Sequence, residues 1–374
     1  MLYLDYAATT PVAPEVFRAM EPYFCKIFAN PSSKHTCGKL ATKAVKDSRE
    51  LLAALIGAQP DEIIFTSGAS EANNLAIKGT AESLDEPAHF ITSAFEHKAA
   101  LNAMKDLQQW GHSLTIVKPR KDGVIHPEDV AKAIRPDTVL CSIMHVNNEI
   151  GTIQPIDDIG DICQARNVKF HTDATQSFGK MPVRAQSNID MISISAHKFY
   201  GPKGIGALYC KKNNSIKCQI SGGSQEGGLR AGTTNVPGIV GMAAAAKFSI
   251  SNMKKEWDRL SELEKSFVDL IRNEIPMAYI QGNPEYKVPW ITNVCFFRAD
   301  ADKIRNELGE REICVSKSSA CSKSGDPSHV LEAIGTPEAL QSGAIRYSFG
   351  HPTKLSDVKL AAKETTCIVA GLRG

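Results

Sequence analysis

Short apolar runs alternate with segments of helical periodicity between about residues 37 and 210. The apolar runs have the length of buried strands and lie at residues 63–66, 90–92, 114–117, 139–144, 168–171 and 189–194. The segments of helical spacing lie at residues 40–55, 75–77, 101–110, 127–134 and 156–166, and Gly57 follows the first of them as a predicted C-cap. Because strands joined by crossover helices are covered on both faces, this rhythm predicts a mostly parallel α/β sheet.

The pattern changes near Gly238. Residues 237–276 predict one long helix, and beyond it the chain mixes short apolar runs with helical segments. The predicted strands lie at residues 291–297 and 344–349, and the predicted helices at residues 301–308 and 355–372. We therefore expect a large domain over residues 15–245 and a smaller α+β domain over residues 246–374, which also takes in residues 1–14.

The composition allows a large core and does not point to a charged partner. The chain has 374 residues, of which 43% are hydrophobic, and a net charge of only +2. That charge gives no electrostatic reason to expect a nucleic-acid or membrane partner. No apolar run is long enough to span a bilayer, and the N-terminus begins with strand-like residues in place of a targeting peptide. We expect a cytoplasmic protein.

One of the ten cysteines, Cys321, has an unusual setting. No cysteine occurs as C-x-x-C or beside a histidine at zinc spacing, which argues against a metal site. We expect most of them to be reduced, buried and inert. Cys321 lies instead in a small, polar stretch at residues 316–326, where lysines favour an exposed thiolate. The alternative is a tolerated surface cysteine.

Lys198 carries the strongest chemical signal. It follows the apolar run at residues 189–194, and glycine and proline force an irregular loop over residues 201–206. A lysine at a strand end, beside serine, histidine and glycine, is suited to form a Schiff base with an aldehyde cofactor whose phosphate its neighbours hold. The alternative is an ordinary surface lysine.

Other strand ends carry matching polar residues. Ligands of open α/β sheets sit at the carboxyl ends of the strands. Small residues at 67–70 enter a helix and leave backbone N–H groups for a phosphate, unless Ser67 or Ser70 simply caps that helix. His97, after the run at residues 90–92, fits a ring stacker or proton carrier, although a lone histidine is more often structural.

Two further strand ends complete the pattern. Asn148 could bond a phenolic oxygen, or simply form a turn. Asp173 is costly at a buried strand end unless it is paired, and a protonated pyridine nitrogen would pair it; a helix cap or a salt bridge is the alternative. The glycine-rich loop at residues 221–233 could reach a phosphate across a subunit interface, or could be merely flexible. Together these signals predict a pyridoxal phosphate site.

The chain resembles a cysteine desulfurase of the NifS/IscS type, a class V aminotransferase family. The resemblance rests on residues 4–10, 30–33, 66–71, 96–98, 146–151, 173–176, 195–206, 318–321 and 345–350. It implies fold type I of the pyridoxal phosphate enzymes: a large domain with a mostly parallel seven-stranded sheet and a smaller α+β C-terminal domain. The stretch after Cys321 resembles the class with a long catalytic loop, rather than the SufS-like class.

The resemblance also implies a role for each matching residue. Lys198 binds the cofactor and moves protons, His97 stacks on the ring, and Asp173 pairs the pyridinium. Cys321 attacks the sulfur of bound L-cysteine, becomes a persulfide and leaves L-alanine, and acceptor proteins then take the sulfur. The implied binding residues are Gln176 and Asn148 at the phenolic oxygen, Ala69, Ser70, Ser195 and His197 at the phosphate with Thr233 from the partner of a homodimer, and Arg346 and Asn30 at the substrate carboxylate.

Three positions depart from the family pattern, and other functions remain compatible with the sequence. Gly227 and His351 stand where arginine is usual, and Ser70 where threonine is usual. Because of the first two, the sequence does not identify the protein that accepts the sulfur. Iron–sulfur cluster assembly, tRNA thiolation and DNA phosphorothioation are all compatible with the sequence. The alternatives are an aminotransferase, a selenocysteine lyase or a kynureninase-like hydrolase on the same fold, or a non-catalytic sulfur carrier.

Overall fold

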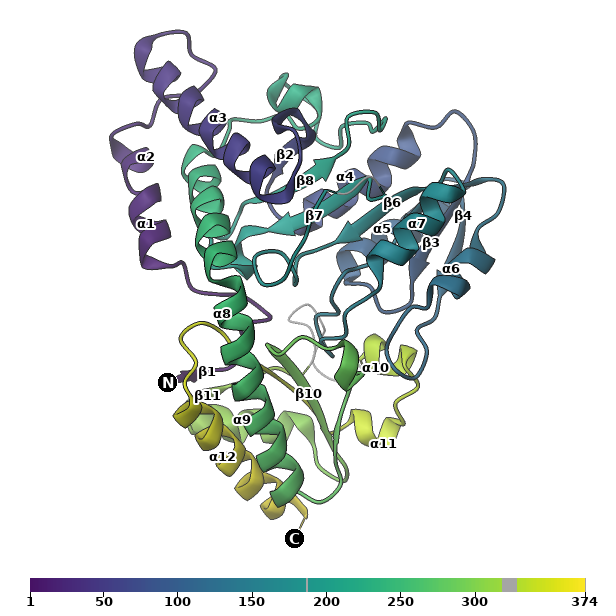
Figure 1. Cartoon of the computed structure of the whole chain (residues 1–374), viewed down its shortest axis with the longest axis vertical. Coiled ribbons are helices and arrows are strands. Elements are labelled where there is room, and N and C mark those ends of the chain that lie inside the picture. Colours follow the sequence, from purple (N-terminus) through teal and green to yellow (C-terminus); the bar gives the residue numbers. More distant parts are fainter. Residues whose placement is uncertain (186–187, 318–327, 374) are drawn as a thin grey trace.

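The computed structural model describes residues 1–185, 188–317 and 328–373. Its central layer is a seven-stranded sheet in the order β2-β8-β7-β6-β5-β3-β4 (Figure 1). The strands are β2 (Ile63–Thr66), β3 (His89–Ser93), β4 (Ser113–Val117), β5 (Thr138–Ser142), β6 (Lys169–Asp173), β7 (Met191–Ser195) and β8 (Gly206–Cys210). β8 runs antiparallel to both of its neighbours and the other pairs are parallel, so the expected mostly parallel sheet is confirmed.

Helices cover both faces of this sheet, because successive strand residues point to opposite sides. Ile91 faces a core that includes side chains of α3, α6, α7 and the later helix α8 (Val236–Glu274), whereas its neighbour Phe90 faces a core shared with α4 and α5. The bounds of the helices over this part of the chain are α1 (Pro14–Met20), α2 (Pro22–Cys25), α3 (Thr36–Ile56), α4 (Ala69–Glu82), α5 (Lys98–Gln109), α6 (Pro127–Ala133) and α7 (Ile156–Ala165). Gly57 ends α3 with φ 74°, as its predicted C-cap role requires.

The C-terminal part builds a second core around a small antiparallel sheet in the order β12-β10-β9. Here β1 (Leu2–Tyr3) pairs with β11 (Ile313–Cys314), so the first residues of the chain lie beside its last third. The remaining elements are α8 (Val236–Glu274), β9 (Ala278–Ile280), β10 (Ile291–Phe296), α9 (Ala301–Glu310), α10 (His329–Ala333), α11 (Glu338–Gln341), β12 (Ala344–Ser348) and α12 (Leu355–Arg373).

Helix α8 joins the two cores (Figure 1). Ile239 and Met242, near its start, belong to the core of the large sheet, whereas Leu263 and Phe267 belong to the C-terminal core. The predicted long helix is thus confirmed. A domain boundary between residues 245 and 246 stays a prediction, and it falls within this continuous helix.

The burial expected for the cysteines is wrong in part. The described cysteines are free, but only some of them are buried, namely Cys141, Cys163, Cys210 and Cys295. Cys25, Cys37 and Cys367 are exposed, because they fall on the solvent faces of helices or helix ends. Over the described residues, no helix has the length and apolarity needed to cross a bilayer.

Candidate active site

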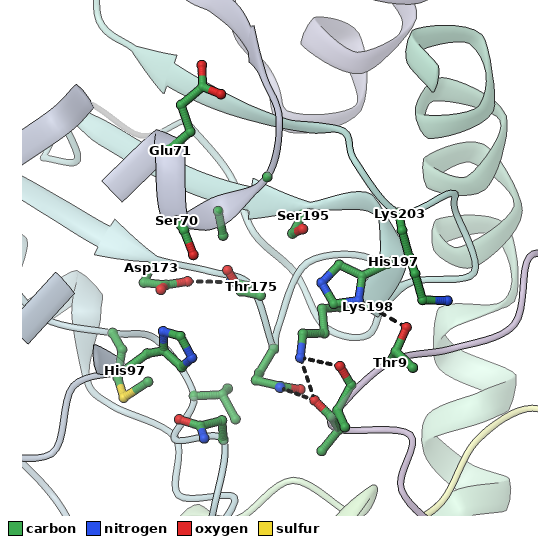
Figure 2. A pocket seen from close by; sticks show the side chains of 18 of the residues that line it. Thr9, Ser70, Glu71, His97, Asp173, Thr175, Ser195, His197, Lys198 and Lys203 are labelled. Atoms are coloured by element: carbon green, nitrogen blue, oxygen red, sulfur yellow. Dashed lines mark hydrogen bonds between the residues drawn. The ribbon is translucent and has the colours of Figure 1, made fainter. Parts of the chain in front are cut away.

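A cavity of about 510 Å³ opens at the carboxyl ends of the parallel strands (Figure 2). This is the edge at which open α/β sheets bind ligands. Its lining brings together most of the residues predicted from the sequence, which are Ala69, Ser70, His97, Asn148, Asp173, Gln176, Ser195, His197, Lys198 and Arg346. Side chains that lie far apart in the sequence therefore share one site.

Lys198 is held at the cavity by the N-terminal segment. It ends the short 3-10 turn Ala196–Lys198 that follows β7. Its Nζ donates hydrogen bonds to the main-chain oxygens of Ala7, at 2.7 Å, and Ala8, at 2.8 Å (Figure 2). Lys198 and Ala7 are 191 positions apart in the sequence, so the tertiary fold sets the position of this amine.

Asp173 lies at the end of β6 and is almost fully buried. Its Oδ2 accepts a hydrogen bond from Asn73 Nδ2 at 2.7 Å, and its Oδ1 accepts one from the Thr175 main-chain N–H at 2.9 Å. Both donors are neutral, and Asp173 forms no ion pair with another described residue. Because a buried carboxylate is costly without a cationic partner, a protonated ring nitrogen in the cavity fits this site.

His97 faces the same cavity (Figure 2). It is the N-cap of α5, and its Nδ1 accepts a hydrogen bond from the Ala99 N–H at 3.2 Å. Burial lowers the pKa of His97, and the charge of Lys198 lowers it further, against the raising effect of Asp173. A neutral ring that accepts at Nδ1 carries its proton on Nε2, so it can stack on a flat ligand or pass a proton.

The start of α4 offers backbone donors to an anion. Gly68 is the N-cap of this 14-residue helix, and no side chain among the described residues caps it, so the interpretation in which Ser67 or Ser70 is the cap is wrong. The free N–H groups and the helix dipole favour a phosphate here. A Cβ at Gly206 would lie 2.6 Å from Gly68 Cα, so glycine is needed where β8 approaches this turn.

His197 and Lys203 lie on the opposite side of this anion site (Figure 2). Burial, together with the charges of the neighbouring Lys198 and Lys203, lowers the pKa of His197 to about 4. The neutral ring is oriented by Thr9, whose Oγ1 lies 3.1 Å from His197 Nδ1. Lys203 was not predicted as a site residue, although its place in the loop after Lys198 was a usable signal.

Several polar atoms of the lining are buried without a hydrogen-bond partner among the described residues. They are Asn148 Oδ1, Thr175 Oγ1 and Gln176 Oε1. The Gln176 side chain is fixed through its Nε2, which donates to Ala7 O at 2.8 Å. Since buried polar groups are normally hydrogen-bonded, these atoms favour a polar ligand in the cavity, such as one with a phenolic oxygen.

Arg346 reaches the cavity from β12 and is almost fully buried. Its Nη1 donates to Asn148 O and its Nη2 to Asp5 Oδ1, both at 2.8 Å. Its Nε has no partner among the described residues. The guanidinium therefore joins the C-terminal sheet to the loop after β5 and to the N-terminal segment, and it leaves a donor for a carboxylate.

Some predicted site residues are not brought to this cavity. Asn30 and Thr233 are exposed, and neither is part of the described lining. Cys321 lies outside the described residues. The sequence reasoning also missed Asn73 and Thr175, the partners of Asp173, because nothing in the sequence links an asparagine in α4 to the end of β6.

The departures at Gly227 and His351 also lie outside the described lining. The neighbour of Gly227, Glu226, is held by Arg49 through two hydrogen bonds of 2.6 and 2.8 Å. His351 Nδ1 lies 3.2 Å from Glu256 Oε1, and both residues line a separate, smaller pocket. These substitutions therefore change the surroundings of the cavity and leave its lining intact.

Known proteins share this architecture. The family model of class-V aminotransferases matches residues 2–360. A cysteine desulfurase IscS of Dictyoglomus turgidum is 44% identical over 375 residues, which cover 100% of this chain and 95% of that protein. A solved NifS-like protein has a TM-score of 0.94 at 35% identity and covers 99% of both chains. The structure of SspA in complex with cysteine has a TM-score of 0.83 at 42% identity, over 93% of this chain and 99% of that one.

Proposed function

The chain belongs to the class-V aminotransferase family and to its cysteine desulfurases, and on that premise we propose that this cavity takes sulfur from L-cysteine and leaves L-alanine. The expected family, fold type I and dependence on pyridoxal phosphate are confirmed by this relationship. One observation carries the proposal for the site: an amine, a buried carboxylate and a neutral imidazole meet in one cavity, as Lys198, Asp173 and His97.

The lining fits the cofactor at each of its polar ends. Lys198 Nζ would hold it covalently, Asp173 would face the ring nitrogen and His97 the ring face. Asn148 and Gln176 would bond the phenolic oxygen, whose O–H can donate to Asn148 Oδ1 and Gln176 Oε1, the atoms without a partner among the described residues. The phosphate would lie between the N–H groups of Ala69 and Ser70 and the side chains of Ser195 and His197. When bound there, the cofactor supplies an electron sink for the α-carbon of the substrate.

We propose that Arg346 binds the substrate carboxylate, since its Nε has no partner in the described part of the chain and its charge is buried. Lys198 Nζ would also take up and return the proton of the substrate's α-carbon. The neutral His97 would assist through its Nε2 proton. A part for Asn30 stays a prediction that the lining does not support.

Sulfur transfer itself requires a thiol, which we assign to Cys321. Its thiolate forms an S–S bond to the substrate sulfur, the bond from that sulfur to the β-carbon breaks, and the electron pair goes to the carbon side, which takes up a proton. L-cysteine and the thiol thereby become L-alanine and a persulfide, without an external oxidant. Support comes from the described residues on either side of residues 318–327. On one side, Ser316 shares main-chain hydrogen bonds with Arg346. On the other side, Ser328 donates a hydrogen bond to Glu149.

We also propose that the protein works as a homodimer and passes the persulfide sulfur to acceptor proteins. Large apolar side chains are exposed around α1 to α3, and they are Phe17, Phe24, Phe28 and Leu40. An exposed cluster of this kind favours a protein–protein interface. The exposed Thr233 would then serve the phosphate of the partner's cavity. The free thiols of the described cysteines are consistent with a reducing, cytoplasmic setting.

The decisive experiment identifies the products made from L-cysteine. With pyridoxal phosphate and a reductant, we expect L-alanine and sulfide in equal amounts, measured by amino-acid analysis and a sulfide assay. Formation of a keto acid would support an aminotransferase instead, and activity confined to selenocysteine would support a lyase. If the protein binds no cofactor, the result would support the alternative of a non-catalytic sulfur carrier.

A further inference from the structure

Two consecutive side chains at the start of α10 reach from the C-terminal part to loops of the large sheet. Ser328 Oγ donates a hydrogen bond to Glu149 Oε2 at 2.6 Å, and it also accepts one from the Leu331 N–H as the N-cap of α10. His329 Nε2 lies 2.9 Å from the main-chain oxygen of Glu96, to which it can donate. These contacts begin directly after residues 318–327.

The receiving loops are those that carry cavity residues. Glu96 precedes His97 and Glu149 follows Asn148, and both glutamates are fully buried. Glu96 Oε1 accepts a hydrogen bond from the Met144 N–H at 3.0 Å, so the loops that follow β3 and β5 are tied to each other. The hydrogen bonds of Ser328 and His329, which we call the α10 anchor, therefore end on two loops that are tied to each other.

Apolar packing holds α10 against the same loops. Val330 and Leu331 are buried in the core of the large sheet, which also contains Phe95 and Ile150. These two residues flank the receiving loops, because Phe95 precedes Glu96 and Ile150 follows Glu149. Apolar packing holds α10 against this surface. The hydrogen bonds of Ser328 and His329 are directional, so they also fix the position of the helix along the surface.

The other side of residues 318–327 converges on the same loop. The Arg346 N–H donates to Ser316 O at 2.6 Å, and the Ser316 N–H donates to Arg346 O at 3.2 Å. Arg346 in turn donates to Asn148 O at 2.8 Å. The chain before and after residues 318–327 is thus tied to adjacent residues, Asn148 and Glu149.

We propose that His329 and Ser328 are positioning residues for sulfur transfer, which register the chain that carries Cys321 against the loops that carry His97 and Asn148. The inference rests on the proposed function, since it concerns the access of the Cys321 thiol to the substrate sulfur. A misplaced reacting group costs rate even when the substrate still binds. Loss of the anchor should therefore lower kcat and leave KM and cofactor binding nearly unchanged.

The test compares His329→Ala with His329→Gln, in which the amide N–H can replace the lost donor. In a single turnover with saturating L-cysteine, mass spectrometry follows the persulfide on Cys321, and absorbance follows cofactor and substrate binding. We expect His329→Ala to slow persulfide formation by about 10- to 100-fold and His329→Gln to restore most of the rate. His126→Ala is the matched control, because His126 is also partly buried at the start of a helix but lies outside the described lining of the cavity.

Ser328→Ala removes the hydrogen bond to Glu149 and so tests the same anchor. It replaces His329→Ala if circular dichroism shows that His329→Ala does not fold. An unchanged persulfide rate in either folded variant, or equal losses in His329→Ala and His329→Gln, would overturn the inference. If the unsubstituted enzyme makes alanine but no persulfide on Cys321, the sulfur-transfer step of the proposed function is wrong, and the inference is overturned with it. If it makes no alanine at all, the desulfurase proposal itself fails.

Discussion

The two sides of the cavity are built in different ways. On the side of the large sheet, each reactive group is fixed by hydrogen bonds at a strand end or helix start, as for Asp173 at the end of β6 and His97 at the start of α5. On the C-terminal side, the described residues contribute a buried guanidinium, Arg346, and the tied flanks of the chain that carries Cys321.

The difference follows the chemistry proposed for each side. Groups that hold a cofactor work best preorganised, because they keep one geometry throughout the reaction. A thiol that first receives sulfur from the substrate and then passes it to a protein acceptor must serve two partners in turn. The described residues on either side of residues 318–327 are held by hydrogen bonds of Ser316 and Ser328, so they fix where the chain that carries Cys321 begins and ends.

The largest expected effect belongs to the sheet side. Lys198→Ala removes the amine that would hold the cofactor and move the substrate proton. We expect desulfurase activity to fall by about 10²–10⁴-fold, the contribution of a positioned acid–base group. The absorption band of lysine-bound cofactor should be lost in a visible spectrum. Lys203→Ala, at the same cavity, should keep the band, and a retained band in Lys198→Ala would contradict the assignment.

Cys321→Ala tests the other side alone. Alanine and sulfide formation should fall by about 10³-fold or more, since no other group would accept the sulfur. The cofactor spectrum and its change on adding L-cysteine should stay intact, because the sheet side is untouched. Cys367→Ala is the control, as Cys367 is exposed on α12. Undiminished sulfide release from Cys321→Ala would contradict the assignment of sulfur transfer to Cys321 and to the C-terminal side of the cavity.

The smallest effect concerns Glu96, whose main chain receives His329. Burial raises the pKa of Glu96 to about 8, against the lowering effect of hydrogen bonds from Ser93 and Met144. Between pH 4.5 and 8 the folded state thus holds a proton that the unfolded state releases, and stability falls as the pH rises. The slope from this group is about 1 kcal/mol per pH unit.

Glu96→Gln should remove that part of the slope, which urea denaturation at pH 6, 7 and 8 would measure. The exposed Glu310 supplies the control variant Glu310→Gln, for which the slope should match that of the unsubstituted protein. Identical slopes in Glu96→Gln and the unsubstituted protein would mean that Glu96 is ionised in the folded state. The tie between the loops after β3 and β5 would then be stronger than a neutral carboxyl allows.

The amino-acid sequence by itself determined the elements and the strand ends that carry chemistry. Apolar periodicity is local, so it predicted the strands up to β7 and the helix α8 to within a few residues. The glycines and polar residues that follow those strands identified Lys198, Asp173 and His97 for the same reason. The polar, lysine-flanked stretch at residues 316–326 also identified Cys321. The resemblance to cysteine desulfurases then supplied its role as sulfur acceptor, and it supplied Arg346.

Only the tertiary structure decided how these residues are held. The carbonyl groups that bind Lys198 come from the N-terminal segment, the amide that binds Asp173 comes from α4, and the carboxylate beside Arg346 is Asp5, 341 positions away. Such contacts join elements that are remote in the sequence, and they form because two cores bring those elements together. No local pattern of hydrophobic and polar residues encodes them, which is why the anchor of α10 also became visible only in the folded chain.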